Sequence, residues 1–145
     1  MKERLRSELH QAMKNRDSLR TGTIRMMIAE LTNKEKEGKP VEEQDVHKVF
    51  FGMLRKREEA IEEFIKAKRD DLAEKEKAEM EIIKEFLPKQ MSEEEIRKEA
   101  RMIIAEVGAK DMKSMGQVMG ILTKKLTGKT SGSILSKIVK EELSK

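Results

Sequence analysis

The residues best suited to binding chemistry lie in a lysine-rich segment near the end of the sequence. Between Gly108 and Lys140 there are seven lysines and a single acidic residue, Asp111, so the segment carries +6 in a chain of net charge +4. Localised positive charge attracts polyanions, of which nucleic acid is the commonest. Lysines can also do no more than solvate a small helical domain, and the pattern alone favours neither interpretation. The candidate nucleic-acid-binding residues are Lys113, Lys124, Lys125, Lys129, Lys137 and Lys140.

The stretch from Gly128 to Gly132, Gly-Lys-Thr-Ser-Gly, ends like a phosphate-binding P-loop, but the complete motif is absent. A P-loop needs glycine where this chain has Thr123, and a preceding strand where this sequence predicts a helix. What remains is a glycine-rich turn with a lysine, leading into a helix N-terminus that favours anions. The alternative, which we favour for both glycines, is a plain helix–turn–helix connection that Gly128 and Gly132 permit.

No arrangement of side chains predicts a catalytic or metal site. There is no cysteine, the two histidines His10 and His47 have no metal-ligand spacing, and no serine lies in a catalytic-triad pattern. Acidic and basic residues are interleaved around residues 55–69, which is typical of a salt-bridged surface helix. We therefore expect no catalytic residue, no metal, no cofactor and no activity from the chain alone.

Two further features bear on location and on the kind of contact. No apolar run approaches the length of a membrane span, and the first residues lack the apolar core of a secretion signal. The sequence therefore predicts a cytoplasmic protein with no membrane partner. With neither Tyr nor Trp, the chain has little to stack bases on, so any RNA contact should go through phosphates and shape.

The elements that must position these lysines are all helical. Every segment with a clear period shows the helical one, and no stretch alternates as a strand does. Four helices are expected up to about residue 88 and three after it. The sequence thus predicts an all-α protein with an N-terminal four-helix domain, residues 1–90, and a three-helix tail domain, residues 91–145.

Proline and capping signals set the predicted boundary and the tail helices. Pro88 stops the fourth helix at Leu87, and Ser92 with Glu95 has the form of a capping box that begins the fifth. Further signals are the left-handed cap Gly108, the N-caps Ser114 and Ser131, and Gly128 at the end of the sixth helix.

Gly116 and Gly120 are four residues apart, so they lie on one face of the predicted sixth helix. In a lipid environment this spacing would indicate helix dimerisation. This segment is flanked by lysines, so we expect instead the close packing of two helices within a small domain, because backbones can approach where there is no Cβ.

Several motifs together resemble the YqeY family, in register over essentially the whole chain. They are RKREEA (55–60), Phe64, AKRDDL (67–72), EFLPKQMS (85–92), IAEVGA (104–109), MGQVMG (115–120) and GKTSG (128–132). Two places depart from the family pattern. The family has Asp-Met-Gly-Lys where this chain has Ser-Met-Gly-Gln at 114–117, and Gly-Lys-Ala-Asp-Gly where it has Gly-Lys-Thr-Ser-Gly at 128–132.

The resemblance carries implications for fold and function. The YqeY family is similar to the C-terminal helical and tail domains of the B subunit of glutamyl/aspartyl-tRNA amidotransferase, a carbon–nitrogen ligase with glutamine as amido-N-donor. In that enzyme the tail touches the tRNA body, while glutamine hydrolysis and acyl-end chemistry lie elsewhere. A similar module begins some glutaminyl-tRNA synthetases. The resemblance therefore implies the same division into four and three helices.

Three functions follow as alternatives. The first is a non-catalytic RNA-binding module whose partner is tRNA. The second is an accessory of a glutamine-dependent tRNA amidotransferase or an aminoacyl-tRNA synthetase complex. The third is a protein-interaction helix bundle with no RNA role.

Overall fold

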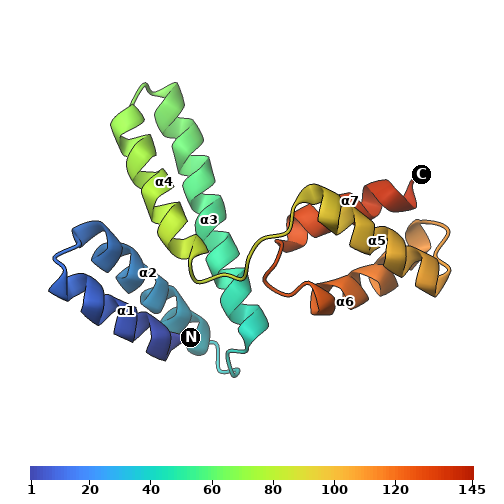
Figure 1. The fold of residues 1–145 in the computed structure, drawn as a ribbon, viewed down its shortest axis with the longest axis horizontal. Coiled ribbons are helices and arrows are strands. Elements are labelled where there is room, and N and C mark those ends of the chain that lie inside the picture. The colour runs from blue at the N-terminus through green and yellow to red at the C-terminus, as the bar shows by residue number, and fades with distance from the viewer. The chain divides into compact units, whose positions relative to one another are not determined.

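The chain is entirely helical, as the sequence predicts. The computed structural model describes residues 1–145 and contains seven α-helices and one short 3₁₀-helix, with no strand. The helices fall into two compact units, Met1–Leu87 and Pro88–Lys145 (Figure 1). The first unit holds α1 (Lys2–Lys14), α2 (Ser18–Glu35), α3 (Glu43–Lys66) and α4 (Asp70–Lys84). The second holds α5 (Glu93–Val107), the 3₁₀-helix η1 (Met112–Ser114), α6 (Met115–Lys125) and α7 (Gly132–Leu143).

The Met1–Leu87 unit is built from two helical hairpins, α1–α2 and α3–α4, which meet where α2 packs on α4 and α3. Apolar residues recur at helical spacing, so each helix has one apolar face, and these faces meet in a single core. The core includes Leu5, Ile24, Met27, Phe50 and Ile83, all inaccessible to solvent.

Arg57 departs from the salt-bridged surface expected around residues 55–69. Its side chain is buried, and its guanidinium donates to the Glu79 carboxylate at 3.1 Å and to the Met53 carbonyl at 3.1 Å. α4 packs along the face of α3 that carries residue 57, so this arginine joins two helices. The charge pattern does not distinguish it from Arg55, which stays exposed beside Glu59.

Three helices end in the same left-handed turn. In each turn the residue with positive φ donates to the carbonyl three residues back, and the next residue donates to the carbonyl five residues back. This is the Schellman motif, which usually places glycine in the left-handed position. Gly108 fills that position after α5 (φ 66°), whereas Arg16 fills it after α1 (φ 55°) and Lys68 after α3 (φ 58°).

The Pro88–Lys145 unit packs α5, α6 and α7 pairwise around a second core. Ala100, Val118, Leu122 and Val139 are inaccessible to solvent within it. The capping box predicted at Ser92 is confirmed, because its hydroxyl accepts from the Glu95 N–H while the Glu95 carboxylate accepts from the Ser92 N–H.

Two details of α6 differ from the sequence prediction. Ser114 makes no side-chain cap; the Asp111 carboxylate instead caps the preceding η1 by accepting from the Lys113 N–H at 2.9 Å. Gly116 and Gly120 do not mark close helix packing, since a Cβ at either position would meet nothing within 4 Å. Both glycines lie on the exposed side of α6, and the buried side carries Val118 and Leu122.

Candidate nucleic-acid interface

The net charge of the molecule belongs to one unit. Residues 1–87 contain 20 basic and 20 acidic side chains, so that unit is neutral, whereas residues 88–145 contain 12 basic and 8 acidic ones. The second unit therefore carries the entire +4. What this charge can bind depends on which basic groups the unit's own carboxylates neutralise.

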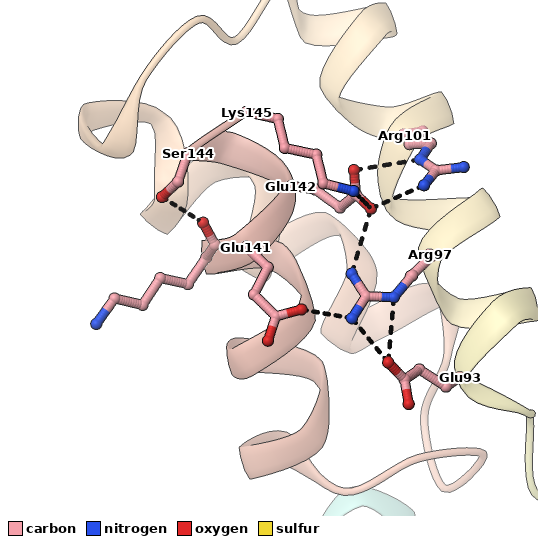
Figure 2. Close-up of polar contacts among 8 residues, drawn as sticks. Glu93, Arg97, Arg101, Glu141, Glu142, Ser144 and Lys145 are labelled. Carbon is pink, nitrogen blue, oxygen red and sulfur yellow. Dashed lines mark hydrogen bonds and ion pairs between the residues drawn. The ribbon is translucent and has the colours of Figure 1, made fainter.

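Most of the ion pairing in this unit occurs in one cluster between α5 and α7, which we call the Arg97–Glu142 cluster: Glu93, Arg97, Arg101, Glu141, Glu142 and Lys145 (Figure 2). Arg97 lies at its centre and donates to all three carboxylates, Glu93 and Glu141 among them. The Glu142 side chain is 4% exposed, and its carboxylate accepts from Arg101 at 3.1 Å and from Lys145 at 3.2 Å.

This pairing lowers the pKa values of the two α7 carboxylates, Glu141 and Glu142. Hydrogen bonds from Arg101, Lys145 and Arg97 outweigh the opposing effect of burial and lower the pKa of Glu142 to about 2. The hydrogen bond from Arg97 lowers the pKa of Glu141. Both arginines are thus held by carboxylates, which leaves the lysines as the cations available to a partner.

Lys125 is also held by a carboxylate. Its ammonium lies 2.8 Å from the Glu99 carboxylate on α5, and this pairing raises the pKa of Lys125. Of the six candidate lysines, this one serves to join α6 to α5. Its sequence neighbour Lys124 has no acidic group within ion-pair distance, although both residues are exposed in the last turn of α6.

The other five candidates are exposed and make no ion pair within the chain. Lys124 continues the exposed side of α6 on which Gly120 lies, and Lys137 and Lys140 share the exposed side of α7. Exposed ammonium groups without internal partners are the groups that can pair with phosphate at little desolvation cost. We call them the free lysines: Lys113, Lys124, Lys129, Lys137 and Lys140.

Lys129 differs from the other free lysines because it lies on the α6–α7 turn rather than on a helix. The turn depends on Gly128, whose φ of 76° lies in the left-handed region. The Lys129 N–H donates to the Leu126 carbonyl at 2.9 Å, and the Ser131 hydroxyl caps α7 by accepting from the Ile134 N–H at 3.3 Å. No acidic residue occupies the first turn of α7, so nothing there repels an anion.

Two contacts to this turn come from the segment that precedes α5, and the sequence gives no signal of them. The Gln90 side-chain amide donates to the Gly128 carbonyl at 2.7 Å, and the Met91 N–H donates to the Lys129 carbonyl at 2.9 Å. The paired residues are 38 positions apart in each case. Only the packing of α5 beside α6 and α7 brings them together.

The remaining surface shows no group of three or more His, Cys, Asp or Glu side chains that could hold a metal ion. None of the helices combines the length and apolar character that crossing a membrane requires.

Comparison with known proteins yields relatives in fungi. A protein of Lachancea thermotolerans named "Altered inheritance of mitochondria protein 41, mitochondrial" is 40% identical over 85 residues, 57% of this chain and 46% of that protein. The Candida glabrata protein of the same name is 37% identical over 86 residues, 57% and 47% of the two chains. A Schizosaccharomyces pombe protein is 37% identical over 89 residues, 61% and 72%. The chain thus spans about half the length of the first two relatives.

These names correct one prediction. The cytoplasmic location expected from the sequence is contradicted, because the Lachancea and Candida relatives are named as mitochondrial proteins. That expectation rested on the composition of the first residues and on the lack of a long apolar run, and neither feature reports on import into an organelle.

A match to a protein-family model covers more of the chain than the matches to these relatives do. The model described as "Yqey-like protein" matches residues 2–143, which is nearly the whole chain and includes every motif on which the resemblance rested. The chain therefore belongs to the YqeY family.

Proposed function

We propose that this chain is a non-catalytic RNA-binding protein whose partner is tRNA. In this proposal the tail domain, residues 91–145, holds the phosphate backbone of folded RNA through the free lysines. The N-terminal domain, residues 1–90, serves as the scaffold from which the tail is presented.

The proposal rests on a difference among the basic side chains of the Pro88–Lys145 unit: some are paired with carboxylates and others are not. The unit that holds the whole net charge pairs its two arginines, Lys125 and Lys145 with its own carboxylates, yet leaves eight lysines exposed without one, and the five free lysines are among them. Stability does not require this arrangement, because exposed unpaired lysines contribute little to folding. A polyanion that supplies phosphates at spaced positions would use all five.

Salt dependence of binding tests the proposal directly. Binding of total tRNA to the purified chain is measured by fluorescence anisotropy from 50 to 300 mM KCl. If all five free lysines contact phosphates, the slope of log K against log salt should be about −3.5 to −4.5, as counterion release requires. A slope near zero, or no binding at the lowest salt, would overturn the proposal and favour a protein-interaction bundle.

A second candidate function is favoured by family membership. Because the YqeY family resembles the tail of the amidotransferase B subunit, the chain could assist a glutamine-dependent carbon–nitrogen ligase by holding its tRNA substrate. Adding the chain to an amidotransferase should then lower the KM for Glu-tRNA and leave kcat unchanged, since the chain supplies binding and no reacting group. An unchanged KM would exclude this role, and glutaminase activity of the chain alone would contradict the non-catalytic assignment.

A further inference from the structure

Among the free lysines, Lys129 alone lies outside a helix. Lys124, Lys137 and Lys140 project from helices whose backbone hydrogen bonds fix them, and Lys113 lies in η1, which the Asp111 carboxylate caps. Lys129 follows Gly128, the residue with the greatest backbone freedom, in a turn of six residues between α6 and α7. Without outside support, ordering this turn would add a conformational cost to every binding event.

The support comes from the segment between α4 and α5. The two N–H groups of the Gln90 amide bridge two carbonyls, that of Pro88 at 2.8 Å and that of Gly128 at 2.7 Å. The next residue, Met91, donates its backbone N–H to the Lys129 carbonyl at 2.9 Å and packs its half-buried side chain against the second core. The carbonyls on both sides of Lys129, that of Gly128 and its own, are thus held by one segment, and the Lys129 side chain remains exposed.

We infer that Gln90 is a positioning residue for RNA binding: its amide fixes the α6–α7 turn so that Lys129 is ordered before a phosphate arrives. This inference rests on the proposed function, because it assigns a role in the same binding surface. Gln90 itself touches no ligand in this account. It acts only through Lys129.

The test is a double-mutant cycle in the full-length chain, with total tRNA as the probe at 100 mM KCl. Gln90→Met keeps the length of the side chain and removes both donors, and Lys129→Ala removes the phosphate contact. Gln44→Met is the matched control, since Gln44 is exposed at the start of α3 and its side chain makes no hydrogen bond. Circular dichroism and the thermal midpoint establish that each variant is folded.

If Gln90 acts through Lys129, Gln90→Met should weaken binding by about threefold to tenfold, the range for the loss of one or two neutral hydrogen bonds. Lys129→Ala should reduce the salt slope by about one. In the Lys129→Ala background, Gln90→Met should have no further effect, which a general loss of stability would not reproduce. Gln44→Met should bind as the parent chain does.

Three other outcomes would overturn the inference, and each has a different cause. Equal weakening by Gln90→Met in both backgrounds would show a general structural effect rather than one exerted through Lys129. Weakening by Lys129→Ala without any effect of Gln90→Met would refute the inference and leave the proposed function standing. Failure of the parent chain to bind tRNA would refute both.

Discussion

At the scale of the residue, two adjacent lysines differ in what they can bind. Lys124 has no acidic neighbour within ion-pair distance, whereas Lys125 lies 2.8 Å from Glu99. We expect Lys124→Ala to weaken tRNA binding and to reduce the salt slope by about one. Lys125→Ala should leave the slope nearly unchanged and lower the free energy of unfolding only slightly, because its side chain is 45% exposed and exposed ion pairs add little to stability. A larger binding defect for Lys125→Ala than for Lys124→Ala would contradict this assignment.

The left-handed turn residues allow a second prediction at this scale. Arg16 and Lys68 hold φ angles of 55° and 58°, where a residue with a Cβ is strained and glycine is not. Arg16→Gly and Lys68→Gly should each raise the free energy of unfolding by about 0.5 kcal/mol, after the extra freedom of glycine in the unfolded chain is subtracted. Lys36→Gly is the control, because Lys36 has a helical φ of −66° and should lose stability instead. Urea denaturation measures all three, and a loss of stability in the first two variants would refute the strain argument.

At the scale of the element, the Arg97–Glu142 cluster ties α5 to α7 and makes that contact sensitive to acid. The pKa of Glu142 in the folded chain is about 2, below its ordinary value of 4.5. A carboxylate with a lowered pKa adds stability above the unfolded pKa and loses it as the pH falls toward the folded one. The contribution is therefore complete above about pH 5 and declines between pH 4.5 and 2, by about 1–2 kcal/mol once screening of the partly exposed cations is allowed for.

Glu142→Gln tests this cluster. The amide cannot ionise, so the variant should be less stable than the parent chain at pH 7, and the difference between them should shrink as the pH falls from 5 to 2.5. Urea denaturation across that range measures it, with Glu106→Gln as control because Glu106 makes no ion pair. If the parent chain and Glu142→Gln lose stability in parallel, the cluster does not join the two helices as described.

The elements also show what the sequence can and cannot predict. The capping box at Ser92 and the helical periods depend on residues within a few positions, so they could be read directly from the chain. The side-chain cap predicted at Ser114 is absent because η1 runs directly into α6, which leaves Ser114 in a helical conformation rather than the extended one that a capping side chain needs. Contacts between residues far apart in the sequence could not be predicted, because they depend on how the helices pack. Examples are the burial of Arg57, the ion pair between Lys125 and Glu99, and the hydrogen bond from Gln90 to the Gly128 carbonyl.

At the scale of the whole molecule, the chain divides into a neutral unit and a unit that carries all of the net charge. A general attraction between a basic protein and RNA would not depend on where a charge is removed, whereas binding by the free lysines would. A binding surface therefore differs from a merely solvated one in that tRNA affinity depends on which lysines are removed.

The most direct test compares two triple variants of equal charge. Lys124/Lys129/Lys140→Glu changes free lysines of the second unit, and Lys39/Lys48/Lys56→Glu changes exposed, unpaired lysines of the first; each takes the net charge from +4 to −2. In a tRNA titration at 100 mM KCl, we predict that the first variant loses about a hundredfold or more in affinity and the second less than about fivefold. Equal losses in the two variants, or retained binding by the first, would contradict the account.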